Sequence, residues 1–434
     1  MWPFLDKPVV QVGDVCFRGP IAPAVDQVLA LATRGVTAGL ADVPAGLDSP
    51  WAVRLAHPTW GDAIITAPRH APVPDADVIR WGTPALTDGE RDAVSRAEVA
   101  LLVQATTPER SVLRARKYLL RWLHLLMELD GLVAIDHASG VFWSQAMLDD
   151  ELAHDADLDV EALYTIHAIH DDGGADPAVD WLHTHGLAEL GAFDVDIVRP
   201  SRLLVQNAGD PLRALAFAAL EGSVTPSTEY FTLGNPAGVV DLVPADTFNA
   251  NAAPEDARLR THDEFHTGRR AVVCEPRGLF SLFRRRPIPS RFLSNVNGNF
   301  VVNFSTASSQ LMAARARQTS DVFQALLAEF GPGGLPNGLK IGYATASDPT
   351  GREHLWFEVH GFEGDRVDAT LMNQPFDVPS LQQGQRGWHA LADVSDWIVS
   401  SPAGPMTPRN LSAARRLRES GWPGGPYAKM MRSA

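Results

Sequence analysis

The sequence has few cysteines, few lysines and no long run of apolar residues. Only Cys16 and Cys274 occur among 434 residues. Two cysteines so far apart form neither a disulfide framework nor a metal-binding knuckle, and a reducing cytoplasm is the simplest compartment for such a chain. The first ten residues lack a basic region followed by an apolar run, so we expect no export through a signal peptide.

The most apolar long segment, residues 112–129, is interrupted by charged or titratable side chains, namely Arg114, Arg116, Lys117, Arg121, His124 and Glu128. A helix that spans a bilayer does not tolerate so many charges, and we expect no membrane insertion. The 37 Lys and Arg residues against 52 Asp and Glu residues give a net charge of −15. Because this charge repels phosphate backbones, and because no zinc finger or basic-region helix occurs, we expect no nucleic-acid partner.

The remaining composition is that of a folded protein. Hydrophobic residues make up 45% of the chain and charged residues 21%, which allows a sizeable core. The length predicts two or three domains of about 100–200 residues each.

Strand-like and helix-like patterns alternate through the first part of the chain. Strands are predicted at residues 9–17, within 51–67, and at 99–104, 132–135, 141–143, 163–170 and 193–198; helices are predicted at residues 25–32, 109–129, 177–190 and 211–220. Thr107 and Pro108 resemble an N-cap and a first helical turn, and Ser144 is placed to cap a further helix. These patterns predict a mixed α and β domain over residues 1–265.

Residues 266–299 interrupt this alternation with prolines and arginines, and we interpret them as a linker. Acidic residues beside basic ones in a proline-rich stretch are typical of a solvated connection. Phe280 and Phe283 lie next to the basic run Arg284 to Arg286. These aromatic side chains could dock on a partner or on an anionic surface, or they could pack between domains.

The third region, residues 300–434, predicts a helix packed on an antiparallel sheet. Apolar residues recur at helical spacing over residues 312–330, and four strands follow at 339–344, 354–360, 366–371 and 387–391, joined by short turns. Trp356 and Glu358 alternate with Leu355 and Phe357, so one sheet face is expected in the core and the other in water. The whole chain is therefore assigned to the α+β class.

Several short motifs in this third region occur together. They are Met312 to Arg317, Glu353-His354-Leu355-Trp356, Leu371 to Pro375, and Val394-Ser395-Asp396-Trp397. In these motifs, residues 308–417 resemble the YegJ-like bacterial domain of unknown function. Residues 133–143 and 183–194 resemble, more loosely, a second bacterial domain of that kind. Neither resemblance implies an activity, a cofactor or a catalytic residue.

The candidate binding residues belong to these motifs: His354, Trp356, Asn373, Asp396 and Trp397. In a functional interpretation, Asp396 is an acid or a ligand in a cleft near His354. In a structural interpretation, Ser395 or Asp396 caps a short helix after the last strand, and Trp397 packs back onto the sheet.

A histidine-rich stretch supplies the only candidate metal ligands, His167, His170, His183 and His185, with Asp171 or Asp172 completing the site. Imidazole and carboxylate groups bind Zn²⁺ or iron, but the spacing matches no known motif. Hydrogen-bonded structural histidines are the alternative. Asp136, His137 and Ser139 are the residue types of a hydrolase triad, although neighbours two apart in a strand do not usually adopt triad geometry.

The resulting hypothesis is a non-enzymatic bacterial cytoplasmic protein that needs no cofactor. It binds a protein partner through the wet sheet face or through the linker. The alternative is a hydrolase, metal-dependent or not, that uses the four histidines.

Overall fold

The fold comes from a computed structural model, which describes residues 10–19, 22–33, 35–74, 79–80, 83, 85–155, 158, 160–170, 179–200, 209–235, 238–254, 256, 269–277, 286–294, 301–302, 306–331, 337–347, 351–421 and 425. Helices and antiparallel or mixed sheets occur together, which confirms the α+β class. The chain forms two compact units. Unit 1 comprises Met1–Pro72, Glu98–Phe142 and Val160–Ser305, and unit 2 comprises Val73–Ala97, Trp143–Asp159 and Thr306–Ala434.

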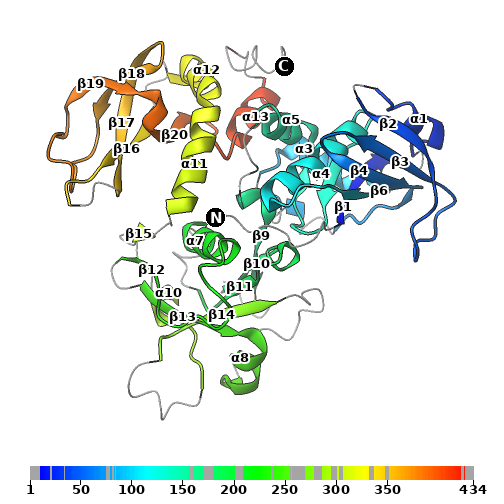
Figure 1. Cartoon of the computed structure of the whole chain (residues 1–434), viewed down its shortest axis with the longest axis horizontal. Coiled ribbons are helices and arrows are strands. Elements are labelled where there is room, and N and C mark those ends of the chain that lie inside the picture. Colours follow the sequence, from blue (N-terminus) through cyan, green and yellow to red (C-terminus); the bar gives the residue numbers. More distant parts are fainter. Residues whose placement is uncertain are drawn as a thin grey trace. The chain divides into compact units, whose positions relative to one another are not determined.

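The first sheet of unit 1 has the strand order β2-β3-β4-β6-β1-β7-β8, with β5 paired to β6. Its strands are β1 (Gln11–Arg18), β2 (Thr37–Ala41), β3 (Ala52–His57), β4 (Gly61–Thr66), β5 (Arg69–His70), β6 (Ala97–Thr106), β7 (Val133–Asp136) and β8 (Phe142–Trp143). Helix α4 (Val112–Met127) packs on β1 and β7, and α1 (Val25–Leu29) on β2 and β3. Figure 1 shows this sheet in blue and cyan.

Helix α4 begins later than residue 109, and the predicted capping role of Thr107 is wrong. The Thr107 hydroxyl accepts a hydrogen bond from the Glu109 N–H at 3.1 Å. The Glu109 carboxylate in turn accepts from the N–H groups of Arg110 and Ser111 at 2.8 and 2.9 Å. These bonds close a turn ahead of the helix, so the helix starts at Val112.

The second sheet of unit 1 has the order β15-β12-β13-β14-β11-β10-β9. Its strands are β9 (Thr165–His170), β10 (Val179–His185), β11 (Asp194–Val198), β12 (Phe231–Asn235), β13 (Gly238–Pro244), β14 (Arg270–Cys274) and β15 (Val301–Val302). The pair β11–β14 is parallel, and the other pairs are antiparallel. Unit 1 also has the helices α7 (Gly209–Leu220), α8 (Ala245–Asn251) and α10 (Arg291–Ser294) and the 3₁₀ turns η1 (Val160–Leu163) and η2 (Ala188–Leu190).

The predicted helix over residues 177–190 is wrong. The segment forms strand β10 followed by the turn η2. Strand β10 pairs with β9 on one side and β11 on the other. Residues 179–185 pair with a strand on each side, and this tertiary pairing overrides the local pattern that predicts a helix.

Unit 2 contains one antiparallel sheet of order β19-β18-β17-β16-β20-β21. Its strands are β16 (Asn337–Ala344), β17 (Arg352–Glu363), β18 (Arg366–Leu371), β19 (Arg386–Ala390), β20 (Val394–Ser401) and β21 (Gly404–Met406), with the 3₁₀ turn η5 (Leu391–Asp393) before β20. The predicted meander of β16 to β19 is confirmed, because each of these strands pairs with the next one in the chain.

Two helices, rather than the single predicted one, cover this sheet. Helices α11 (Thr306–Gln318) and α12 (Ser320–Phe330) are separated at Thr319 and pack against β20 (Figure 1). The Thr319 hydroxyl donates to the Arg315 carbonyl at 2.9 Å and accepts from the indole N–H of Trp397 at 3.0 Å. The helix break therefore supplies the one polar partner that the buried Trp397 ring needs.

The predicted cap at Ser395 or Asp396 is wrong, because these residues lie in strand β20 and no helix follows them directly. Asp396 pairs with Lys340 of β16. Trp397 lies in the hydrophobic core, as the structural interpretation predicts, and its ring stacks on Phe323 with 5.4 Å between centroids.

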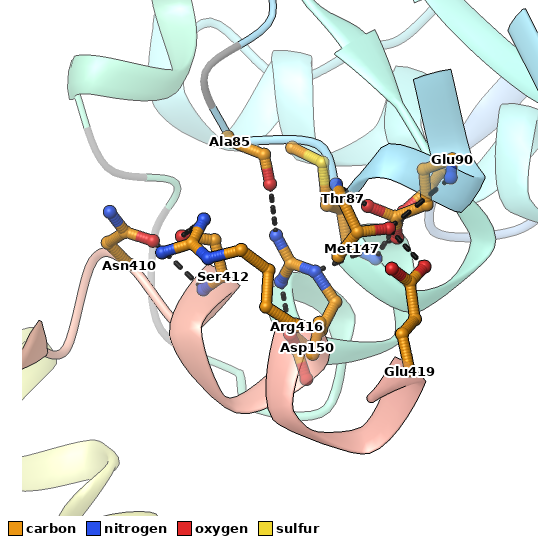
Figure 2. Close-up of polar contacts among 11 residues, drawn as sticks. Ala85, Thr87, Glu90, Met147, Asp150, Asn410, Ser412, Arg416 and Glu419 are labelled. Atoms are coloured by element: carbon orange, nitrogen blue, oxygen red, sulfur yellow. Dashed lines mark hydrogen bonds and ion pairs between the residues drawn. The ribbon is translucent and has the colours of Figure 1, made fainter. Parts of the chain in front are cut away.

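Three short helices complete unit 2: α3 (Asp88–Ser95), α5 (Gln145–Leu152) and α13 (Ser412–Glu419). Figure 2 shows the polar contacts among them. Arg415 of α13 donates to the Asp150 carboxylate at 2.7 Å and to the Ala85 carbonyl at 2.8 Å. Ser144 caps α5 by accepting the Met147 N–H at 3.1 Å, which confirms its predicted role.

Buried ion pairs join the early segments of unit 2 to its later part. Arg415 and Asp150 are both almost fully buried, as are Arg315 of α11 and Glu151 of α5, which form a second pair. A buried charge needs its counter-charge. These pairs connect residues 143–159 with residue 306 onward, and the hydrogen bond from Arg415 to the Ala85 carbonyl connects residues 73–97 with the same part. The predicted ranges 1–265, 266–299 and 300–434 stay a prediction about independent folding, and much of 266–299 lies outside the described residues.

We expect Trp397→Ala to lower the free energy of unfolding by ~3–5 kcal/mol, the cost of removing a large aromatic side chain from a packed core. Ile398→Ala is the matched control, because Ile398 is its neighbour in β20 and is partly exposed. The control should cost less than about 1 kcal/mol. Guanidinium unfolding followed by circular dichroism measures both, and equal costs would contradict the assignment of Trp397 to the core.

We expect Arg415→Met to lower the free energy of unfolding by about 3–5 kcal/mol, because it leaves the buried Asp150 carboxylate without its counter-charge. Combining it with Asp150→Leu should recover part of this loss. The measurement is a double-mutant cycle in chemical denaturation. Strictly additive costs would show that the two side chains are not coupled.

Candidate functional site

The six-stranded sheet of unit 2 has a buried face and an open face. Leu355 and Phe357 of β17 lie in the core, while His354, Trp356 and Glu358 alternate with them on the other side. The register of the strand pairs shows which residues of the neighbouring strands lie on this second side. We call it the outer face, and it carries Lys340, His354, Trp356, Glu358, His360, Asp368, Thr370, Arg386, Trp388, Asp396 and Ile398.

Two tryptophans of the outer face each lie under a cation. The Lys340 ammonium lies 5.1 Å from the centroid of the Trp356 ring, and the Arg366 guanidinium lies 5.8 Å from the centroid of the Trp388 ring. Trp388 is 42% exposed and Met372, just past the end of β18, is 46% exposed. Cation–π contacts restrict both rings without covering them completely.

His354 is half-buried and contacts Ser395. Its Nδ1 atom lies 2.7 Å from the Ser395 hydroxyl oxygen, which also lies 3.3 Å from the Lys340 carbonyl oxygen. Burial lowers the pKa of His354 below its ordinary value, the charges of Lys340 and Arg352 lower it further, and Asp396 acts in the opposite direction. The imidazole is therefore held in its neutral form at neutral pH.

The five candidate binding residues do not form one cluster of equal exposure. Trp356 lies on the outer face, and the Asn373 side-chain oxygen accepts the backbone N–H of Trp356 at 2.8 Å. Asp396 accepts the N–H of Trp397 at 2.9 Å. Trp397 is buried, so it contacts the core rather than the surface. Asn373 thus positions β17, and the side chains open to a partner are Trp356 and, in part, His354 and Asp396.

Trp388 and Met372 are not among the candidate binding residues predicted from the sequence, although Met372 belongs to the motif Leu371 to Pro375. The signal for Trp388 is the alternation in β19, where Gly387 and His389 face inward and the Tyr343 hydroxyl lies 2.5 Å from His389 Nδ1. The same alternation places Trp388 opposite Asp368 on the outer face. Arg386 donates to Asp368 at 2.9 Å, and this hydrogen bond lowers the pKa of the Asp368 carboxyl.

Three of the four candidate metal ligands gather in unit 1. His167 lies opposite His183 in the β9–β10 pair, with 5.0 Å between ring centroids, and His167 and His185 stack at 5.7 Å. His183 also stacks on Trp181 at 4.2 Å. The side chain of His170 and all of Asp171 and Asp172 lie outside the described residues. Across the part of the chain that the structure describes, no group of three His, Cys, Asp or Glu residues is arranged to hold a metal ion.

The residue types of a hydrolase triad do not come together. The Asp136 carboxylate accepts from Arg116 at 2.7 Å, and Ser139 is buried with its hydroxyl accepting the Val141 N–H at 3.3 Å. His137 contacts a different carboxylate, that of Asp14, at 2.7 Å. Each group thus has another partner, and no triad forms.

Comparisons with protein families assign two segments to domains of unknown function. Residues 166–245, from β9 to the first residue of α8, match the model described as protein of unknown function (DUF4026) C-terminal. Residues 308–407, from α11 past the end of β21, match the model described as uncharacterized protein conserved in bacteria (DUF2314). No curated protein and no solved structure matches the chain. Two domains of unknown function are thereby confirmed, and the second is of a kind conserved in bacteria.

We expect the protein to lose stability as the pH falls through about 6.5, the ordinary pKa of histidine. Burial lowers the pKa values of His354 and His389 in the folded state, so protons bind the unfolded chain more tightly. The stability that these two neutral imidazoles contribute is fully present above the pKa of histidine in the unfolded chain. It is lost as the pH falls below that pKa. His354→Gln removes one of these groups and should flatten the fall in unfolding midpoint between pH 7.5 and pH 5.5. An unchanged pH dependence in this variant would contradict the assignment.

Proposed function

We propose that this chain is a non-enzymatic bacterial protein of the cytoplasm that binds a protein partner through the outer face of unit 2. The observation that carries the proposal is the exposure of Trp388 and Met372, beside the half-buried Trp356, on a sheet whose other face is already covered by α11 and α12. Tryptophan, methionine and arginine are enriched at protein interfaces, and aromatic anchors supply much of their binding energy.

The rigidity of the outer face favours binding. Cations hold the Trp356 and Trp388 rings, and the Asn373 side chain joins the end of β18 to β17. The Glu353 carboxylate accepts the N–H groups of Phe376 and Asp377 at 2.7 Å each, which holds the loop that presents Phe376. A surface ordered before binding loses less conformational entropy when a partner docks.

Strand β19 adds backbone groups to this surface. Among the described residues no strand pairs with its far side. The Leu371 N–H donates to the Gln385 carbonyl and the Leu391 N–H to the Asp365 carbonyl. By antiparallel alternation, the N–H and carbonyl groups of Trp388 then point away from β18. An extended segment of the partner can pair with this edge while its side chains contact Trp388.

The other parts of the proposal rest on composition and on the comparisons. The two free cysteines are buried, which is compatible with a reducing cytoplasm. The net charge of −15 disfavours a nucleic-acid partner. Among the described residues, no helix is long and apolar enough to cross a bilayer. We further propose that the match over residues 308–407 and the YegJ-like resemblance describe the same domain.

The hydrolase alternative has less support. The described histidines of the β9–β10 pair contact one another and Trp181 through their rings. Metal analysis of the purified protein tests this alternative directly. Stoichiometric zinc or iron that is lost in a His183→Ala/His185→Ala variant would favour the hydrolase over the binding protein.

The test of the proposal is affinity capture followed by binding to the purified partner. The double variant Trp356→Ala/Trp388→Ala should weaken binding at least tenfold, since loss of anchors costs more than about 1.4 kcal/mol in total. Leu40→Ala is the matched control, because Leu40 is an exposed apolar residue of β2 in unit 1. If the double variant, folded to the same midpoint, binds as tightly as the control, the outer face is not the docking surface.

A further inference from the structure

Unit 1 contains a buried carboxylate with two partly exposed partners. The side chain of Asp14, in strand β1, is fully buried. Arg69 of β5 donates to both carboxylate oxygens from one nitrogen, Nη2, at 2.8 and 2.6 Å. His137, which follows β7, places Nε2 at 2.7 Å from the same Oδ2 atom. The Arg69 side chain is 43% exposed and the His137 side chain 34% exposed.

Asp14 fixes the orientation of both partners. A carboxylate accepts hydrogen bonds, so the contact assigns the proton of a neutral His137 ring to Nε2 and leaves the Nδ1 lone pair available. Arg69 uses only Nη2, which leaves the N–H groups at Nε and Nη1. Within the described residues, no hydrogen-bond partner contacts His137 Nδ1, Arg69 Nε or Arg69 Nη1. The two side chains that share Asp14 therefore offer an acceptor and a cationic donor, and both side chains are partly exposed.

The two side chains converge on one oxygen atom. Arg69 Nη2 and His137 Nε2 lie 2.6 and 2.7 Å from Oδ2 of Asp14, so the shared oxygen atom holds the ends of the two side chains next to each other. The neighbouring Cys16 is no nucleophile here. Its burial raises the thiol pKa to about 12, and the charge of Asp14 acts in the same direction.

We propose that Arg69 and His137 form a phosphate-binding site with Asp14 as the positioning residue. An anionic phosphate oxygen accepts from Nη1 or Nε of Arg69, and guanidinium groups match phosphate well. The hydroxyl of a singly protonated phosphate group donates to Nδ1 of His137. The ligand chemistry is a tetrahedral oxyanion that also carries a proton, as in inorganic phosphate or a small phosphate monoester. No bond of the ligand is broken.

Sulfate provides the matched probe. It is also tetrahedral and anionic, but it carries no proton at neutral pH and cannot donate to His137. We expect isothermal titration of the full chain to show saturable phosphate binding at least about tenfold tighter than sulfate binding. A phosphate monoester that binds more tightly than inorganic phosphate would identify a monoester as the ligand, and the reverse order would identify inorganic phosphate.

Variants separate the two contributions. Arg69→Lys keeps a cation beside Asp14, so the buried carboxylate stays paired, but it removes the N–H fork and should weaken phosphate binding at least tenfold. His137→Leu should reduce the preference for phosphate over sulfate. Arg54→Lys is the matched control, since Arg54 is an exposed arginine of the same unit paired with Asp62. This variant should change neither the affinity for phosphate nor the preference for phosphate over sulfate.

Three results would overturn the proposal. They are the lack of saturable phosphate binding at tens of millimolar, equal affinity for sulfate and phosphate, and unchanged phosphate binding in a folded Arg69→Lys protein. The unfolding midpoint of each variant confirms that it is folded. None of these measurements depends on the protein partner proposed for unit 2, so the two proposals are tested separately.

Discussion

The need to bury one face of the six-stranded sheet governs the structure of unit 2. Leu355, Phe357 and Trp397 pack against α11 and α12, and the period of two along each strand then forces their neighbours outward. Trp356 lies on the outer face because Leu355 and Phe357 point into the core. The same constraint breaks the covering helix at Thr319, whose hydroxyl accepts the indole N–H of Trp397. The core and the proposed docking surface thus both result from the alternation of side chains along the strands of this sheet.

Local pattern predicted the meander well and predicted long-range contacts poorly. Strands β16 to β19 each pair with the next strand in the chain, and a tight turn between Glu363 and Arg366 fixes the register of β17 and β18 locally. Strand β10 was taken for a helix, because its pairing with β9 and β11 is not visible in its own sequence. The contact between Asp14 and His137 spans 123 positions. The sequence shows the residue type of His137, but its pattern does not supply the partner of this side chain.

Two other buried carboxylates of unit 1, those of Asp136 and Asp241, show how Asp14 differs from them. Asp136 is paired with Arg116, whose side chain is equally buried. Asp241 accepts the backbone N–H groups of Tyr230 and Arg277 at 2.8 and 3.0 Å. The partner of Asp136 is a buried side chain, and the partners of Asp241 are backbone N–H groups. Such partners satisfy a buried carboxylate that has a structural role. Asp14 is compensated by two partly exposed side chains. Among the residues that the structure describes, these side chains keep hydrogen-bonding atoms without a partner, which a purely structural pair does not need.

The two proposed surfaces differ in the interaction that each one offers. The outer face of unit 2 presents aromatic and thioether groups on a preorganised sheet, which is the composition of a surface for macromolecules. The Asp14 site presents a directed cation and a directed lone pair in a small area, which is suited to one polar group. Loss of a ring from the first surface removes buried apolar contact, whereas loss of the guanidinium fork from the second removes hydrogen bonds of fixed direction. Binding at the Asp14 site depends on charge, whereas binding at the outer face depends on the burial of apolar surface. Added salt should therefore weaken binding of the oxyanion more than binding of the protein partner.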